Sequence, residues 1–242
     1  MRDYEEELRK RVNFIQKILK NSQAEGIVYG NSGGKDSALV GALCKTACVN
    51  TLGVIMPCGS KRNYEEDTRD ALSVAECFGI DTITVDLTCV KNGLMDSLKE
   101  SINITATAAA NISPRLRMTT LYAVAASQNS IVAGTGNRSE AYMGYFTKWG
   151  DGAYDLNPIS DLTVTEIYEF LRYLNAPEQI ITKAPSAGLF DGQTDEGEMG
   201  ITYDKIDDYL LNGNATAQDK AIIDKYHNRS QHKRSNPAVY QD

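Results

Sequence analysis

Eight consecutive residues carry the side chains and the spacing of a phosphate-binding loop. They are Gly30, Asn31, Ser32, Gly33, Gly34, Lys35, Asp36 and Ser37. Glycines allow backbone N–H groups to approach an anion closely, and Ser32 and Ser37 add hydroxyl donors. The carboxylate of Asp36 would repel a phosphate unless a divalent cation lay between them. The loop therefore predicts a phosphate that is bound together with Mg²⁺.

Two common nucleotide-binding patterns do not fit this loop. A Walker loop requires Gly at the position of Tyr29 and Ser or Thr at the position of Asp36. The dinucleotide fingerprint G-x-G-x-x-G does not fit the spacing of these glycines either. What remains resembles the Ser-Gly-Gly-x-Asp-Ser loop of the ATP pyrophosphatases, which split ATP into AMP and pyrophosphate while they adenylate a carboxylate or carbonyl oxygen. The resemblance implies ATP as the ligand of the loop.

The surrounding sequence predicts that the loop connects a buried strand to a helix. Amphipathic or apolar patterns predict helices at 4–20, 38–49 and 65–78 and strands at 26–29, 52–57 and 81–86. Strands that alternate with helices predict a doubly wound α/β fold, in which a mostly parallel, Rossmann-like sheet is flanked by helices. In ATP pyrophosphatases the ends of the second and third strands approach the adenosine, so Met56 and residues 85–87 are further candidates.

A second turn is predicted to face the first one. Residues 130–134 read as a fourth strand, and the turn that follows begins at Thr135 and enters a helix near Glu140. In a sheet of order 3-2-1-4 the first and fourth strands are neighbours, and both turns open at the same topological switch point. Asp36, Ser37, Thr135 and Glu140 are therefore expected to converge, with Asp36 and Glu140 as a magnesium pair. The alternative for Glu140 is a solvent-exposed helix residue.

Length, charge and cysteine content narrow the class of protein. A chain of 242 residues suits one domain, 1–242, with a C-terminal helical extension and no room for a separate glutaminase domain. The net charge of −7 argues against a nucleic-acid or membrane surface. The five cysteines lack the spacing of a zinc site and suit reduced thiols of a cytoplasmic protein, and no signal peptide is evident. Binding of anions should depend on a few local cations.

The segment between the third and fourth strands is long and helical in pattern. Residues 104–112 are rich in Ala, Thr and Asn, and a clearer helix is predicted at 116–127. Small residues allow close helix packing, which suits either a dimer surface or packing within one chain.

A segment in the middle of the chain reads Gly144-Tyr145-Phe146-Thr147-Lys148-Trp149-Gly150-Asp151-Gly152. This segment closely resembles one of the ammonia-dependent NAD synthetases. Residues 134–140, 157–159, 185–189 and 200–210 also match, so the resemblance covers nearly the whole chain. One departure is that many bacterial members carry Asp-His where this chain has Gly136-Asn137. Members of this family have an adenine nucleotide alpha hydrolase-like fold and amidate deamido-NAD with ATP and ammonia through an adenylated nicotinate carboxylate.

The resemblance implies a role for particular residues of this chain. ATP would be bound by residues 30–37, Thr135, Lys183 and Thr202, with Ser186 as the competitor of Thr202, and magnesium by Asp36 and Glu140. Deamido-NAD would be bound by Arg115, Lys148, Asp155, His232 and Lys233. The residues implied in catalysis are Asp36, Glu140, Lys148, Lys183 and Asp151, although Asp151 could equally be a structural turn residue. The family also implies a homodimer.

Two other functions fit the sequence less well than NAD synthesis. A tRNA-modifying adenylating enzyme would need a basic face and usually paired cysteines, which the charge and the cysteine spacing disfavour. A nucleotide sensor without turnover would not need both Asp36 and Glu140. Release of pyrophosphate would distinguish an enzyme from a sensor.

Overall fold

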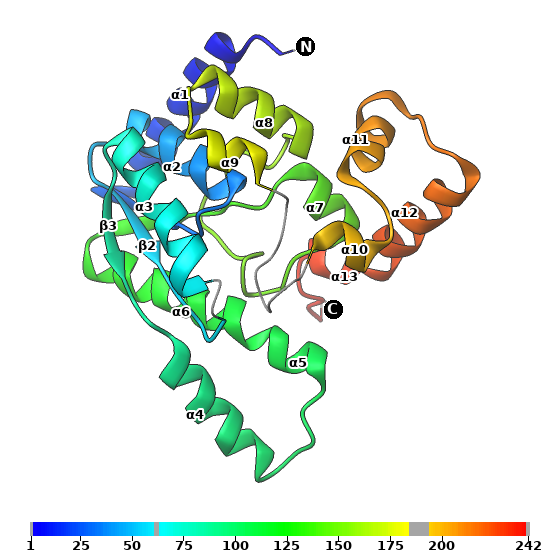
Figure 1. Ribbon diagram of the computed structural model, residues 1–242. Helices are drawn as coiled ribbons and strands as arrows, with labels where there is room; N and C mark the ends of the chain where they lie inside the picture. The colour runs from blue at the N-terminus through cyan, green and yellow to red at the C-terminus, as the bar shows by residue number, and fades with distance from the viewer. Residues whose placement is uncertain (1, 61–62, 184–193, 241–242) are drawn as a thin grey trace.

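A parallel sheet of order β3-β2-β1-β4 forms the centre of the molecule (Figure 1). The computed structural model describes residues 2–60, 63–183 and 194–240. Its strands are β1 (Gly26–Gly30), β2 (Thr51–Ile55), β3 (Asp81–Thr84) and β4 (Ser130–Ala133). In the register of the sheet, Ile27 of β1 lies beside Thr51 of β2 and Ile131 of β4. The predicted α/β class and the predicted strand order are both confirmed.

Helices cover both faces of the sheet because successive side chains of β1 point to opposite sides. Ile27 and Tyr29 are buried in one core, and Val28 is buried in the other. The helices of the first core are α1 (Tyr4–Ser22), α2 (Lys35–Ala47), α3 (Thr68–Phe78), α8 (Val164–Tyr173) and α9 (Glu178–Thr182). The second core is covered by α6 (Ile112–Ser127). The loop between β1 and α2 is thus fixed between two packed layers.

The C-terminal extension has a core of its own. It consists of α10 (Asp195–Met199), α11 (Tyr203–Asn212), α12 (Ala217–Arg229) and α13 (Gln231–Arg234), and α7 (Arg138–Met143) packs against α11 and α12. Met143, Tyr203, Ile206 and Ile223 are buried together there. Because α7 directly follows β4, this extension packs beside the switch point of the sheet (Figure 1).

The helices between β3 and β4 differ in detail from the prediction. The segment with a helical pattern contains α4 (Thr88–Lys99) and α5 (Ala106–Ala110), neither of which has a buried residue. Helix α4 extends away from the body of the molecule, whereas α5 lies beside α6 (Figure 1). Helix α6 begins at Ile112, four positions before the predicted start at residue 116, because Pro114 is tolerated in a first turn, where its missing N–H group needs no partner. A π-helical turn, η1 (Asn63–Asp67), likewise extends the start of α3. Among the helices of the described residues, none is long and apolar enough to cross a membrane.

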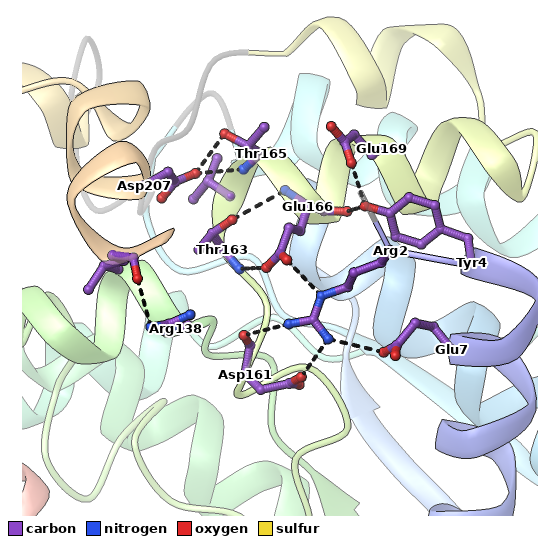
Figure 2. A network of polar contacts seen from close by, with 12 residues as sticks. Arg2, Tyr4, Glu7, Arg138, Asp161, Thr163, Thr165, Glu166, Glu169 and Asp207 are labelled. Carbon is purple, nitrogen blue, oxygen red and sulfur yellow. Dashed lines mark hydrogen bonds and ion pairs between the residues drawn. The ribbon is translucent and has the colours of Figure 1, made fainter. Parts of the chain in front are cut away.

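A polar network fixes α8 against its neighbours (Figure 2). Arg2 donates to Glu166 Oε1 at 2.6 Å, and Glu166 Oε2 accepts the N–H of Thr163 at 2.9 Å. From α11, Asp207 Oδ2 accepts both the N–H and the hydroxyl of Thr165 at 2.7 Å. The first turn of α8 is therefore tied to the N-terminal segment on one side and to the C-terminal extension on the other.

Candidate active site

The loop between β1 and α2 packs against η1 and α3. Gly33 has a φ of +71°, and a Cβ there would lie 2.4 Å from the carbonyl oxygen of Asp67, so only glycine fits. The buried Asn31 donates to the carbonyl of Ala71 at 2.9 Å. No side chain caps the first turn of α2, which is the arrangement of helix N termini that bind anions.

Two carboxylates from the two facing turns meet at one lysine. Lys35 Nζ lies 2.7 Å from Asp36 Oδ2 and 3.9 Å from Glu140 Oε1. Asn137 Nδ2 donates to the other oxygen of Asp36 at 3.0 Å. The structure therefore brings Asp36 and Glu140 together, as the parallel pairing of β1 with β4 predicts.

The charges of this cluster do not balance. Burial, and then repulsion from Asp36, raise the pKa of Glu140 well above its ordinary value. Burial lowers the pKa of Lys35, but attraction to Asp36 and then to Glu140 outweighs this effect, so the pKa is raised. One ammonium group thus faces two carboxylates, and the cluster favours additional positive charge.

These groups lie in a cavity of about 900 Å³. Most residues that the sequence predicts for the site line this cavity. They are Gly30, Asn31, Ser32, Gly34, Lys35, Asp36, Ser37, Thr135, Glu140, Asp151, Lys183, His232 and Lys233. Gly33, Arg115, Lys148, Asp155 and Thr202 are not part of the lining. Ser186 lies outside the described residues.

The cations predicted to bind deamido-NAD donate to backbone carbonyls. Arg115 Nη2 donates to the carbonyl of Lys148 at 3.2 Å, and Lys148 Nζ donates to the carbonyl of His232 at 2.6 Å. Lys233 Nζ donates to the carbonyls of Gly144 at 2.8 Å and Phe146 at 2.6 Å. Hydrogen bonds from Lys148 and Lys233 to backbone carbonyls therefore connect residues 144–152 with α13.

Three other predicted residues occupy structural positions. Asp155 Oδ2 accepts the N–H of Val132 in β4 at 2.7 Å, and Thr202 is the N-cap position of α11, where its side chain makes no capping hydrogen bond. Asp151 is an exposed residue that lines the cavity and accepts the N–H of Thr147 at 2.9 Å, and desolvation by the surrounding protein raises its pKa. A raised pKa suits a group that exchanges a proton near neutral pH.

Lys183 is held by acidic residues of η1 and α3. Its Nζ lies 2.8 Å from Asp67 Oδ1 and 2.7 Å from Asp70 Oδ2. Burial lowers the pKa of Lys183, but the hydrogen bonds to these two carboxylates outweigh burial and raise it. The side chain of Lys183 lines the same cavity as the phosphate loop. Its ammonium group lies beside η1 and α3, which carry Asp67 and Asp70.

The sequence analysis missed two polar residues of the cavity region. Asn137 contacts Asp36, and it also forms a capping box with Glu140. The Asn-x-x-Glu spacing is a sequence signal for such a box and could have identified Asn137. Arg117 lines the cavity from α6 and donates to the carbonyl of Met56 at 3.2 Å. Met56 lines the cavity too, as expected, whereas residues 85–87 do not.

A glycine-rich loop at the switch point of a parallel sheet, with paired carboxylates beside it, defines an α/β nucleotide-binding protein of the ATP pyrophosphatase class. Comparison with known proteins gives the family. The profile of the NAD synthase family matches residues 7–237, and the chain belongs to this family.

Individual relatives agree with this assignment. The chain is 50% identical over 240 residues to the NH(3)-dependent NAD(+) synthetase of Carboxydothermus hydrogenoformans, covering 98% of each chain. It is also similar to the solved structure of NMN synthetase from Francisella tularensis, with a TM-score of 0.95, 38% identity and complete coverage of both chains. The NH3-dependent NAD synthetase of Campylobacter jejuni gives a TM-score of 0.80 at 32% identity, again with complete coverage of both.

Proposed function

We propose that the protein amidates deamido-NAD with ammonia, at the expense of ATP, and so catalyses the final step of NAD biosynthesis. In the first step, a nicotinate carboxylate oxygen attacks the α-phosphorus of ATP, and pyrophosphate leaves. Ammonia then attacks the acyl carbon, AMP leaves, and the amide is formed. The observation that carries the proposal is that the phosphate loop and His232 and Lys233 of α13 share one cavity. Both reactants can therefore meet in it.

The residues of the chain have defined roles in this reaction. Residues 30–37 bind the ATP phosphates, and Thr135, Lys183 and Thr202 or Ser186 add further contacts. The acyl substrate is bound by Arg115, Lys148, Asp155, His232 and Lys233. The transition state spreads negative charge over phosphorus and pyrophosphate, so the cations stabilise it most. Asp151, which lines the cavity and has a raised pKa, can accept the proton that ammonia loses.

The donor set fits Mg²⁺ bound together with ATP. Asp36 and Glu140 already direct oxygens at one positive atom, that of Lys35, and together they carry surplus negative charge. Within the part of the chain that is described, no three His, Cys, Asp or Glu side chains form a metal cluster. Mg²⁺ commonly takes one or two carboxylates and completes its shell with substrate phosphates and water. When bound, it would neutralise charge on the phosphates during adenylation.

A second substrate is favoured by the likeness to NMN synthetase, which has the highest TM-score among the comparisons given above. The same chemistry applied to nicotinate mononucleotide would form NMN. The phosphate loop and the carboxylate pair would act identically, and only contacts to the second nucleotide would differ. We therefore treat the mononucleotide as the alternative acyl substrate.

The proposal also includes a cytoplasmic homodimer with a single catalytic domain. The surface that supports a dimer is formed by α4 and the end of β3, where Val90, Leu94 and Ile83 are exposed. Their exposed fractions are 54%, 39% and 39%. Apolar side chains of this size suit a contact with a second copy. Sedimentation of a monomer at working concentration would remove the dimer from the proposal.

One experiment tests the reaction and its substrates. Pyrophosphate, NAD and NMN are measured with ATP, Mg²⁺ and either deamido-NAD or nicotinate mononucleotide, with ammonium or glutamine as nitrogen donor. We expect NAD from deamido-NAD with ammonium and no product with glutamine. A higher kcat/KM for the mononucleotide would select the alternative substrate. Absence of pyrophosphate release with both substrates, from folded protein that binds ATP, would refute the proposal.

A further inference from the structure

One side chain, that of Asn137, connects the two acidic residues of the cavity. Its Nδ2 donates to Asp36 Oδ1 at 3.0 Å, and its Oδ1 accepts the N–H of Glu140 at 2.9 Å. Its own N–H donates to Glu140 Oε2 at 3.3 Å. The residue is completely buried. Turning the amide round would set oxygen against oxygen at Asp36 and donor against donor at Glu140, so the network fixes its orientation.

Both oxygens of Asp36 are engaged, but by donors of different kinds. Oδ2 faces the ammonium of Lys35 at 2.7 Å, which neutralises charge. Oδ1 faces the neutral amide of Asn137, which orients the carboxylate without cancelling its charge. A carboxylate oxygen has two lone pairs, so Oδ1 can keep the amide bond and still serve a cation. Lys35 must give way to a cation, whereas Asn137 need not.

Few side chains could perform both tasks of Asn137. Asp and Ser are also good N-caps, so either could accept the N–H of Glu140. Asp has no donor for Asp36 when it is ionised, and it would repel that carboxylate. Ser is shorter by the whole amide group that spans the distance to Asp36. The dual contact therefore requires an amide of this length.

We propose that Asn137 is a positioning residue for the metal–nucleotide complex, because it holds Asp36 in the orientation in which Asp36 and Glu140 bind the same cation. The inference rests on the proposed function, since it takes a divalent cation with ATP as the ligand of these carboxylates. Groups that orient metal-binding carboxylates typically change metal affinity or activity by roughly 10- to 100-fold. Loss of the amide should have an effect of that size.

The test uses Asn137→Ser, which keeps the helix cap and removes the bond to Asp36. Binding of Mn²⁺ with α,β-methylene-ATP is measured by electron paramagnetic resonance of free Mn²⁺, without any acyl substrate, beside the melting temperature. We expect the dissociation constant of Mn²⁺ to rise roughly 10-fold or more, with little change in melting temperature. Unchanged Mn²⁺ binding in the folded variant would overturn the inference. Failure of the wild-type protein to bind Mn²⁺ and nucleotide would instead refute the proposed function.

Two further variants separate positioning from capping. Asp3 caps α1 by accepting the N–H of Glu6 at 3.1 Å and does not line the cavity. Asp3→Ala should lower the melting temperature and leave Mn²⁺ binding as in the wild type. Asn137→Asp keeps the cap and the volume but replaces the donor by a charge, so its pyrophosphate release should fall at least as far as that of the serine variant. Wild-type turnover and Mg²⁺ dependence in Asn137→Asp would contradict the inference even if Asn137→Ser did not fold.

Discussion

Replacing Glu140 by Gln should stabilise the ligand-free protein while removing its activity. A single ammonium, that of Lys35, faces Asp36 at 2.7 Å and Glu140 at 3.9 Å. These carboxylate side chains are only 17% and 18% exposed, so the surplus negative charge is poorly solvated. Glutamine keeps the shape of Glu140 and an oxygen that can accept the N–H of Asn137, but it carries no charge.

The sign of the effect follows from the raised pKa of Glu140. Burial first, and repulsion from Asp36 second, raise this pKa well above its ordinary value of 4.5. The folded chain then binds the proton more tightly than the unfolded chain, so stability falls as pH rises from 4.5 to the folded pKa and stays low above it. We expect Glu140→Gln to exceed the wild type in free energy of unfolding near pH 8 by on the order of 1 kcal/mol, the usual size of a single-residue effect.

Melting temperatures in the absence of nucleotide and metal, at about pH 5 and about pH 8, test this reasoning. For a domain of this size, about 2–4 °C corresponds to 1 kcal/mol, so the variant should melt roughly 2–4 °C higher at the upper pH, with a smaller difference at the lower one. Pyrophosphate release should fall by about 100-fold or more, as when a transition-state contact is removed. An equal difference at both pH values, or a variant less stable than the wild type near pH 8, would refute the argument.

The remaining predictions concern Lys183 and the close approach at Gly144. Lys183→Met removes the ammonium from Asp70, whose side chain is 5% exposed, and should lower the free energy of unfolding by about 3 kcal/mol. Adding Asp70→Asn should restore stability but not the KM for ATP; recovery of both would make Lys183 purely structural. Gly144 and Gly79 have φ values of +68° and +64°, but only at Gly144 would a Cβ meet another residue, at 2.0 Å from Ser230 Cβ. Urea unfolding should therefore show Gly144→Ala to be more damaging than Gly79→Ala by about 1–3 kcal/mol, and equal losses would argue against this packing.

The fold and the position of the phosphate loop could be predicted because they depend on local sequence. A glycine pair between a strand pattern and a helix pattern defines the loop that ends at Ser37, and alternating elements define the parallel sheet. The convergence of Asp36 with Glu140 needed one further step, the strand order, which general rules for such sheets supply. The structure confirms that order.

Contacts between distant side chains could not be predicted in the same way. Asn137 reaches Asp36 across 101 positions in the sequence, and the pairing of Lys183 with Asp70 spans 113. The spacing of apolar residues in the sequence does not predict such contacts, because they depend on the angle at which helices leave the sheet. The first turn of α6, residues 112–115, is not predicted for a local reason. Pro114 is compatible both with the segment before a helix and with its first turn.

The strand order has a consequence for the growing chain. β1, which carries the buried residues Ile27, Val28 and Tyr29, lies between β2 and β4, and β4 is synthesised about a hundred residues after it. Until β4 emerges, β1 is an edge strand with unpaired N–H and C=O groups and an apolar sequence. Such an edge can recruit a strand from another chain. Any chain that stops before residue 130 therefore exposes the strand at the centre of the fold as a site of aggregation, and no active site can form without the strand that covers it.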